Sequence, residues 1–515
     1  MSESKATSTP LDQAWAIGLA LFLPLLAMSL RGVDASWDLR NYHLYNAHAW
    51  LSGRMSIDVA PAQIQSFHNP LLDVPLYLIV HSGAAARWAS AWLTLPCIAS
   101  IYFILRLQLS LSITFPSPLS QGVLALLALT GAAMYSTLGL STNDAFVAAA
   151  TLGSLLLVVG GNEAGGKHHR WLCAGLVMGA MAGLKLTAAI YCVGLAAAAL
   201  VQGDWANRVR CLGRLALGGL LGFVATYGYW GWRLFSEHGN PFFPYYNNIF
   251  RSPDAWPISW ADTRFRPDTL LDAVLAPVHL LSRSVRFSEL RMNDPRLLLG
   301  LVGLGALLAL AWRKHPSFRE KFAFLFVFFV ASFLCWVLQY GIYRYAIALE
   351  LLGALALVLL LDRLPRQRRL TMFVAFLLVS ADTHRPNWGH SREVPPMAGI
   401  RAPPLGSDAL VVTANDDPVA YLALGLPDTI PLIAVNNNFM SPERGTPLQL
   451  RAEQKIANHT GPIWLLAIDG SGLEKAQKVL SGAFGLEPMA PCIAYPNALA
   501  PALLCLERHR VPAKP

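Results

Sequence analysis

Long apolar segments recur along this chain, and they constrain its fold more than any other feature. A helix that crosses a bilayer needs about 20 mostly apolar residues. The chain has 515 residues and is 54% hydrophobic but only 14% charged, whereas soluble domains average about 25% charged residues. The sequence therefore predicts an all-α polytopic membrane domain with about eleven transmembrane helices. The expected spans are residues 14–32, 86–106, 120–139, 145–160, 171–184, 186–202, 215–234, 295–312, 322–339, 345–361 and 370–381.

Lysine and arginine gather in alternate loops between these spans. Cytoplasmic loops of membrane proteins are enriched in both residues, so the pattern predicts a cytoplasmic N-terminus and places residues 33–85, 235–294 and 382–515 outside. Basic residues do not alternate with aromatic ones in a stripe, and we therefore expect no binding of nucleic acid. The basic loops are residues 161–170, 203–214, 313–321 and 362–369.

Two segments predicted to lie outside have their own expected structure. Residues 70–84 are apolar but too short to span, which favours an interfacial helix within the outer loop 33–85. Short β-like runs alternate with a helical pattern at 472–483, so residues 382–515 are expected to form a small extracytoplasmic α/β domain beside a membrane domain of residues 1–381. The runs are residues 409–413, 430–435 and 463–468.

Cys492 and Cys505 both fall in this C-terminal region. An oxidising compartment would allow a disulfide between them. Two buried free thiols are equally compatible with the sequence, because spacing alone does not give the separation of their Cα atoms. Both alternatives therefore stay open.

Polar residues at membrane level gather at helix ends on the side predicted to be outside. They are Asp38 and Arg40 after the first span, Asn143 and Asp144 after the third, Lys185 between the fifth and sixth, and Arg344 with Tyr345 before the tenth. Ionisable residues at membrane depth are rare and usually functional.

Each of these residues also has a simpler structural interpretation. Asp38 could cap a helix over residues 39–52, and Asp144 could cap the span 145–160. Lys185 could extend to the lipid headgroups, and Arg344 could be an interfacial anchor. Glu350, inside the tenth span, is expected to pair with another span or to line a cavity.

A metal site is not expected. His43 and His48 are five residues apart, which is not the i, i+4 spacing that two ligands on one helix face need. Asp34 and Asp38 could share a helix face, so a divalent cation is conceivable, but no ligand pattern supports one. No other cofactor is predicted.

The order of several short motifs resembles the GT-C superfamily of integral membrane glycosyltransferases, over about residues 14–361. Within that superfamily the sequence is most similar to the bacterial mannosyl- and arabinosyltransferase-like branch. The motifs are Asp38 after the first span; Tyr42, Tyr45, Ala47, Leu51, Gly53 and Arg54; Asn69-Pro70; Arg87; Asp144; residues 183–185; residues 239–244; and Arg344-Tyr345.

The resemblance implies an inverting glycosyltransferase of the bacterial cytoplasmic membrane. Its expected donor is a polyprenyl-phosphate sugar from the bilayer, and its acceptor a saccharide, lipid or protein of the cell envelope. Asp38 is the expected general base, and Asp144, the second residue assigned to catalysis, is expected to orient the acceptor or the region of Asp38. Leu39 follows Asp38 where the family often has a second acid or an amide, which disfavours a metal-dependent mechanism.

A sugar hydroxyl needs a base as it attacks, whereas phosphate leaves as a stabilised anion and needs positive charge nearby. Lys185 and Arg344 are the candidates for that charge. Arg40, His43, Asn143 and Tyr345 are further candidates for binding substrate. Two other functions remain open: a transporter or flippase of lipid-linked saccharides, and a non-catalytic partner subunit with the same fold.

Overall fold

The computed structural model describes residues 10–112, 116–160, 167–314, 316–364, 368–392, 400–496 and 499–509. Parts of the predicted basic loops 161–170, 313–321 and 362–369 lie outside the described residues. The chain forms two compact units. Unit 1 comprises Met1–Arg31, Leu93–Gly228 and Asp262–Trp388, and unit 2 comprises Gly32–Trp92, Tyr229–Ala261 and Gly389–Pro515.

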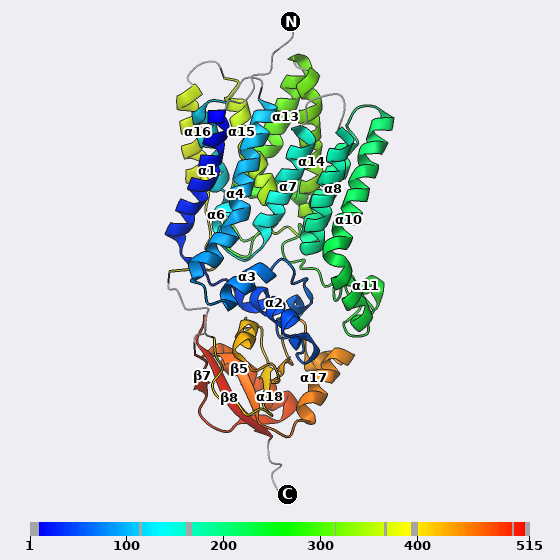
Figure 1. Cartoon of the computed structure of the whole chain (residues 1–515), viewed down its shortest axis with the longest axis vertical. Helices are drawn as coiled ribbons and strands as arrows, with labels where there is room; N and C mark the ends of the chain where they lie inside the picture. The colour runs from blue at the N-terminus through cyan, green and yellow to red at the C-terminus, as the bar shows by residue number, and fades with distance from the viewer. Residues whose placement is uncertain are drawn as a thin grey trace. The chain divides into compact units, whose positions relative to one another are not determined.

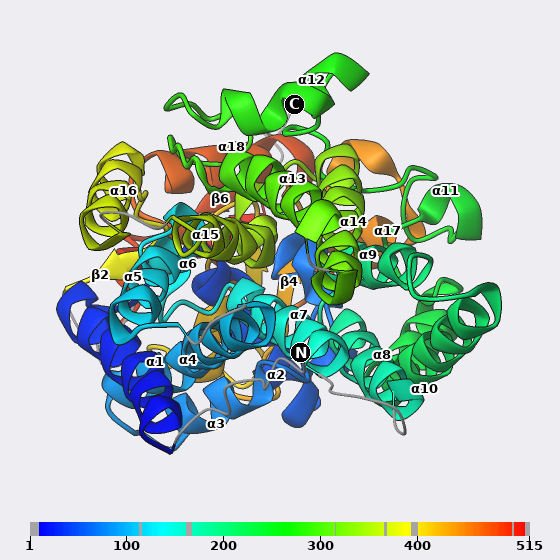
Figure 2. The same ribbon diagram turned by 90° about the horizontal axis from the view of Figure 1, so that it is seen from above.

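Unit 1 is a helical bundle built around α15 (Figures 1 and 2). α15 (Ile347–Leu361) is buried over most of its length, and it packs against α5, α6, α7, α13, α14 and α16. Such a helix is apolar on all sides because every side meets another helix. The helices are α1 (Pro10–Arg31), α4 (Ala86–Leu111), α5 (Pro118–Leu129), α6 (Ala132–Thr137), α7 (Asp144–Val159), α8 (Lys167–Leu184), α9 (Ala189–Ala199), α10 (Trp205–His238), α12 (Leu270–His279), α13 (Arg296–Lys314), α14 (Pro316–Gln339), α15 and α16 (Arg368–Asp382). The first residues of α4 and the last residues of α10 belong to unit 2.

Five helices among the described residues are long and apolar enough to cross a membrane. Further apolar helices are shorter, at 10–17 residues. The segments predicted as spans are largely helical, but the number of crossings stays a prediction. The five long segments are Gln13–Arg31, Ala86–Leu111, Trp205–His238, Phe318–Gln339 and Tyr343–Leu361.

Glycine allows α8 and α10 to lie in close contact. A Cβ on Gly179 would lie 2.0 Å from the carbonyl oxygen of Gly219, and one on Gly222 would lie 2.2 Å from that of Leu176. Apolar attraction gives little net drive between helices in lipid, so small residues that let backbones approach become important. Alanine at either glycine would therefore push the two helices apart.

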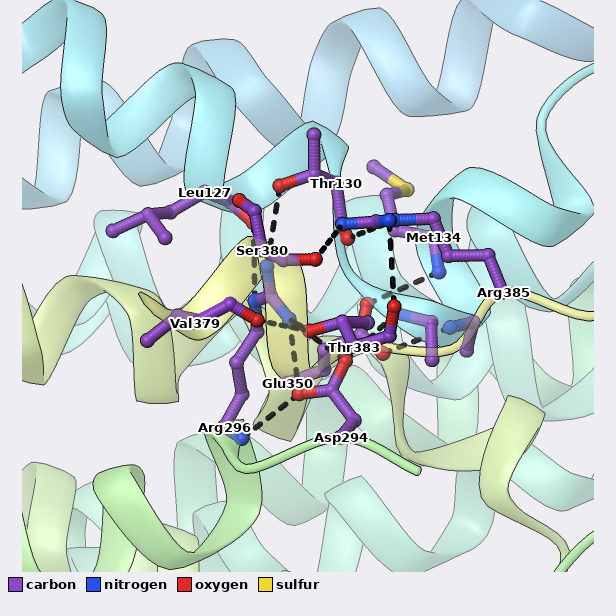
Figure 3. A network of polar contacts seen from close by, with 12 residues as sticks. Leu127, Thr130, Met134, Asp294, Arg296, Glu350, Val379, Ser380, Thr383 and Arg385 are labelled. Atoms are coloured by element: carbon purple, nitrogen blue, oxygen red, sulfur yellow. Dashed lines mark hydrogen bonds and ion pairs between the residues drawn. The ribbon is translucent and has the colours of Figure 1, made fainter. Parts of the chain in front are cut away.

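The predicted span 120–139 is divided into two helices, α5 and α6. The reason lies in two carboxylates that take the first N–H groups of α6 (Figure 3). Asp294 accepts from the Ala132 N–H at 2.7 Å, and Glu350 accepts from Ala133 at 2.9 Å and Met134 at 3.0 Å. These N–H groups cannot also donate within one continuous helix, and negative charge is favourable at a helix N-terminus. Glu350 thus pairs with another helical segment, which was one of its two expected roles.

Arg296 forms an ion pair with Asp294, one of these two buried acids (Figure 3). Its Nη1 lies 2.8 Å from Asp294 Oδ2 and 2.9 Å from Thr383 Oγ1. Its Nε donates to the Leu127 carbonyl at 3.1 Å, and its Nη2 to Thr130 Oγ1 at 3.2 Å. All three guanidinium nitrogens therefore have acceptors, and the Arg296 side chain is fully buried.

Unit 2 contains an α/β sheet with strand order β4-β3-β5-β8-β6. β3 (Leu410–Thr413) is parallel to β4 (Leu432–Ala434) and to β5 (Ile463–Ile468), whereas β8 (Ala502–His509) is antiparallel to β5. The predicted strands and the predicted helix 472–483 correspond to β3, β4, β5 and α18 (Ser471–Phe484). The remaining elements of unit 2 are β1 (Val33–Asp34), α2 (Leu44–Leu51), α3 (Val74–His81), α11 (Asn247–Phe250), β2 (His390–Ser391), α17 (Pro447–Ala457), β6 (Leu486–Pro488) and β7 (Ile493–Ala494).

The segment 32–92 packs on the C-terminal sheet within unit 2. Val59 forms a parallel bridge to Ile433 in β4. Arg54 is buried, pairs with Asp58 at 3.0 Å, and donates to the carbonyl of Ile430 at 2.8 Å. Unit 2 therefore extends beyond the domain predicted for residues 382–515, because it also contains residues 32–92 and 229–261.

Cys492 and Cys505 form a disulfide. Cys505 lies in β8, and the neighbouring strand β7 pairs with β8 next to it. Of the two alternatives left open by the sequence, the structure has the disulfide. The bond closes the hairpin between β7 and β8 at the edge of the sheet.

Candidate active site

A break in the helical backbone places Lys185. α8 ends at Leu184, and Lys185 has extended backbone angles, with φ −145° and ψ 106°. The sequence predicts two spans here, 171–184 and 186–202, and the helical backbone breaks at the lysine between them. Its Nζ donates to the carbonyl of Thr142 and to the carboxylate of Asp144. The Lys185 side chain is 16% exposed, so it is held inside the unit and does not extend to the lipid headgroups.

Asp144 is the first residue of α7 and is almost fully buried. The preceding Asn143 is in the left-handed region, with φ +62°, and its side chain makes no capping bond. A carboxylate in the first turn is stabilised by the helix dipole. The Asp144 carboxylate also meets two cations, so capping is not its whole role.

Arg344 is the second cation at Asp144. Its Nη1 lies 3.5 Å from Asp144 Oδ2, and its Nε donates to Glu289 Oε1 at 3.2 Å. The guanidinium therefore lies between two carboxylates, one from the start of α7 and one from the loop before α13. An arginine held in this way is more than an interfacial anchor.

Tyr345 joins the two cations. Lys185 Nζ and Arg344 Cζ each lie 5.4 Å from the centre of the Tyr345 ring. The backbone carbonyl of Tyr345 accepts a hydrogen bond from the Tyr191 hydroxyl at 2.7 Å, which fixes this turn. We call Asp144, Lys185, Glu289, Arg344 and Tyr345 the Asp144 cluster. Its two acids and two bases balance in charge, and its cations are only partly buried.

The other predicted site residues lie in unit 2. Asp38 is half-buried and is followed directly by a π-helical turn, Leu39–His43. Its side chain makes no capping hydrogen bond at that turn, so the helix-cap interpretation is not supported. π-Helical turns occur frequently at functional sites, because the extra residue re-aims side chains. Asp34 lies in strand β1, so the expectation that Asp34 and Asp38 share a helix face was wrong.

Arg40 and His43 both lie in the π-helical turn. His43 is buried, and its Nδ1 lies 2.7 Å from Asp73 Oδ1. Arg40 is half-buried, and its Nε has no hydrogen-bond partner within the described ranges. Arg40 is near Tyr421, whose pKa is raised to about 12, chiefly by burial. In the part of the chain that the structure describes, no group of three or more His, Cys, Asp or Glu side chains is placed to hold a metal ion.

No protein-family model matches the sequence, and no curated protein is similar to it. The structure, in contrast, resembles solved proteins. A crystal structure of ArnT from Cupriavidus metallidurans bound to undecaprenyl phosphate matches with a TM-score of 0.55 and 14% sequence identity, over 96% of this chain and 97% of that chain. ArnT is a GT-C glycosyltransferase. This chain has the GT-C fold.

Two further solved structures are similar at a lower level. The apo state of the same ArnT has a TM-score of 0.48 and 14% identity, over 96% of this chain and 97% of that chain. An oligosaccharyltransferase from Archaeoglobus fulgidus, in complex with Zn and sulfate, has a TM-score of 0.44 and 12% identity, over 88% and 67%. The assignment of the fold rests on the ArnT structure bound to undecaprenyl phosphate, with its TM-score of 0.55.

Two residues of these sites were not predicted from the sequence. Glu289 lies in a long loop in which no spacing singles it out, and only the fold brings it to Arg344. Asp73 precedes α3 and was read as part of an apolar interfacial segment, although it meets His43. An isolated acid inside an otherwise apolar stretch was the only available signal for Asp73.

Proposed function

We propose that this chain is a glycosyltransferase that moves a sugar from a polyprenyl-phosphate donor to an acceptor outside the cytoplasm. The observation that carries the proposal is the convergence of Lys185 and Arg344 on Asp144 within a bundle of apolar helices. The GT-C fold supports it, because an ArnT with this fold binds undecaprenyl phosphate. The acceptor class is a saccharide, lipid or protein of the cell envelope.

The Asp144 cluster suits the phosphate of such a donor. Lys185 uses two of its three N–H groups on Thr142 and Asp144, which leaves one for a ligand. Arg344 has the planar fork that binds phosphate oxygens in pairs. Asp144 and Glu289 hold both cations in place before the donor arrives. Such preorganisation lowers the barrier, because the positive charge need not move as the phosphate leaves. In this proposal Asp144 positions the cations.

The transfer itself needs one base and no strong acid. The acceptor hydroxyl gives up its proton as its oxygen attacks the anomeric carbon, and the bond to the phosphate oxygen breaks on the opposite side. The phosphate leaves as an anion, and the configuration of the sugar inverts. We retain Asp38 as the predicted base, with Arg40, His43, Asn143 and Tyr345 as predicted contacts to substrate. The π-helical turn after Asp38 supports a functional role there.

We also propose that unit 2 lies outside the cytoplasm and that the N-terminus is cytoplasmic, in a bacterial cytoplasmic membrane. Two independent features support this orientation. The basic residues favour it, and the disulfide between Cys492 and Cys505 is typical of an oxidising compartment. About eleven crossings remain the expectation, with the shorter apolar helices completing the set.

The test is sugar transfer by the purified chain in liposomes, offered a panel of labelled polyprenyl-phosphate sugars and a mixed envelope extract as acceptor. We expect the wild type to release free polyprenyl phosphate, and Asp38→Asn to release far less. Lys475→Ala, which removes an exposed lysine from α18, is the matched control and should behave as wild type. Equal release by Asp38→Asn and wild type would keep the enzyme class and remove Asp38 from the mechanism.

No release from any donor would refute the transferase. Movement of an intact lipid-linked saccharide across the liposome would then indicate a transporter or flippase. Neither transfer nor movement, with Lys185 and Arg344 replaceable without effect, would indicate a non-catalytic subunit.

A further inference from the structure

An arginine held between two tryptophan rings marks a second candidate site, within unit 2. The guanidinium carbon of Arg444 lies 5.5 Å from the ring centre of Trp256 and 5.1 Å from that of Trp260. The indole N–H of Trp256 donates to the Arg444 carbonyl at 3.1 Å, and that of Trp260 donates to the Trp256 carbonyl at 3.1 Å. Both indole N–H groups are thus used internally. Trp256 is 44% exposed, so its ring can meet a ligand.

The aromatic pair has a rigid base. Trp260 packs on Phe439 with ring centres 4.9 Å apart, and Phe439 packs in turn on Phe243 and Phe67. Phe439 and Phe243 are buried. Trp260 has φ +58°, which is uncommon for a residue with a side chain. A surface tryptophan held in that conformation by a buried cluster is fixed in direction.

Polar side chains lie at the carboxyl ends of β3 and β4, next to Arg444. Asp416 follows β3 and Asn438 follows β4, and both are exposed. Arg444 Nη1 donates to the Asn438 carbonyl at 3.3 Å, and Asn438 Oδ1 accepts from the Ile64 N–H at 3.4 Å. In open α/β sheets, ligands bind outside the carboxyl ends of parallel strands.

A buried acceptor beneath this edge points independently to a ligand or an ordered water. Gln63 is 1% exposed, and its Nε2 donates to the Asp416 carbonyl at 2.9 Å. That bond directs its amide to the carboxyl end of β3. Gln63 Oε1 has no hydrogen-bond partner among the residues described. Buried polar atoms are almost always paired, so a hydroxyl donor from outside the chain would complete this one.

The neighbouring crevice between β3 and β5 is already filled. Asn415 donates to the Gly472 carbonyl at 2.7 Å, and a Cβ on Gly472 would lie 2.2 Å from Asp417 Oδ2. The Asp417 carboxylate therefore occupies the N-terminal end of α18, where such folds commonly bind phosphate. The start of α18 therefore does not favour a nucleotide or a free phosphate.

We propose that Trp256, Trp260, Arg444, Asp416, Asn438 and Gln63 form a saccharide-binding surface that holds the sugar portion of the acceptor. The inference rests on the proposed function. A pyranose ring has faces of C–H groups rimmed by hydroxyls. An exposed indole face suits the former, because its π cloud attracts polarised C–H groups. The planar amide, carboxylate and guanidinium groups at its rim suit the hydroxyls.

The experiment is saturation-transfer-difference NMR on the full chain in nanodiscs, without any lipid-linked donor. The probes are cellobiose, maltose, mannobiose and chitobiose, with sorbitol as a polyol that lacks a ring face. We expect at least one disaccharide to bind and sorbitol not to bind. Trp256→Ala should weaken binding by about tenfold or more, whereas Trp256→Phe, which keeps a ring face but loses the N–H, should retain most of it.

Trp232→Ala is the matched control, because Trp232 is also an exposed tryptophan of unit 2 (67% exposed) and is not part of the surface. It should bind as wild type does. Arg444→Lys keeps the charge and loses the planar fork, and should bind more weakly. No binding of any disaccharide by the wild type, or equal binding by Trp256→Ala, would overturn the proposal. Because no donor is present, such a failure would leave the proposed transfer reaction standing. A failed transfer assay would leave the saccharide-binding surface standing but would remove its role in holding an acceptor.

Discussion

Unit 1 holds two clusters of buried charge, and they differ in how completely their polar atoms are paired. Around Arg296 every guanidinium nitrogen has an acceptor, and the arginine, Asp294 and Glu350 are fully or almost fully buried. Around Asp144 the two cations keep 14–16% of their side-chain surface exposed.

The difference separates a structural cluster from a candidate functional one. Arg296 joins α13 to the ends of α5 and α16, and its acids fix the start of α6. A ligand could enter that cluster only by breaking bonds that hold helices together. In the Asp144 cluster the acids position the cations but leave them accessible, which is what binding an anion requires. The predictions below test this division, from the largest expected effect to the smallest.

Replacing Arg296 with methionine should have the largest effect on stability. The buried carboxylate of Asp294 would lose its ion-pair partner, and losing one partner of such a pair costs about 3–5 kcal/mol. Thermal unfolding in detergent, followed by fluorescence, should show a large fall in the midpoint. Arg286→Met is the control, because it removes an arginine from a partly exposed pair with Asp272, for which about 0–1 kcal/mol is typical. Equal midpoints for both variants would contradict a structural role for Arg296.

Lys185→Ala should lower the transfer rate more than the stability, in contrast to Arg296→Met. We expect a loss of about 10²–10³ in kcat, the effect typical of removing one preorganised charge contact in an active site. The unfolding midpoint should fall less than in Arg296→Met, because Arg344 still pairs with Asp144. Arg344→Lys should lose less, since it keeps the charge but not the planar fork. Transfer assays normalised to folded protein check both variants. A midpoint as low as that of Arg296→Met, with transfer per folded molecule unchanged, would assign the Asp144 cluster to structure.

Local sequence patterns predicted the helices of unit 1 and the polar residues at the ends of these helices. The apolar segments located the helices of unit 1, and rare charges at their ends picked out Asp144, Lys185, Arg344 and Tyr345, which the structure brings together. Asp144, Lys185 and Arg344 stand out because charge near a membrane is rare, and Tyr345 was included because it directly follows Arg344. Glu289 does not stand out, because it lies in a long loop among several charges and only the folded chain places it beside Arg344.

Less of unit 2 could be predicted from local sequence patterns. Its β-like runs predicted the parallel strands correctly, because buried parallel strands are continuously apolar. The joining of residues 32–92 and 229–261 to that sheet depends on contacts between distant segments, such as the bonds from Arg54 to the carbonyls of Pro427 and Ile430. No periodicity within a segment encodes such a contact. Asp38 remains a prediction that only an activity assay can test.

Glu507 extends the comparison to a buried acid that has no cationic partner among the described residues. It is 4% exposed in β8, neither carboxylate oxygen has a hydrogen-bond partner among the described residues, and burial raises its pKa to about 7. The folded state therefore holds the proton more tightly than the unfolded state. Stability is full below about pH 4.5 and falls as the pH rises to about 7, by about 3 kcal/mol in total.

Glu507→Gln should remove this pH dependence of stability, and its effect should be the third largest of those considered. At pH 8 the variant should protect the amides of residues 502–509 from hydrogen exchange better than wild type, after correction for intrinsic rates. At pH 4 the two should be alike. Glu443→Gln, at an exposed glutamate of unit 2, should match wild type at both pH values. Equal protection of Glu507→Gln and wild type at pH 8 would mean that the acid is paired when ionised.

Glu289→Gln should give the smallest effect of these variants. It tests whether a single acid of the Asp144 cluster serves function or structure. Glu289 touches Arg344 through Nε, while Asp144 holds the same guanidinium through Nη1. Without the Glu289 carboxylate, the Arg344 guanidinium keeps Asp144 as its one charged partner and is held less firmly. We therefore expect about a tenfold fall in kcat/KM, which corresponds to about 1.4 kcal/mol. Asp272→Asn removes a carboxylate from the partly exposed pair with Arg286 and should leave transfer unchanged. If Glu289 merely packs the loop, the unfolding midpoint will fall with activity, and Glu289→Asp will not restore transfer. If it positions Arg344, the midpoint will stay near wild type and aspartate will recover part of the rate.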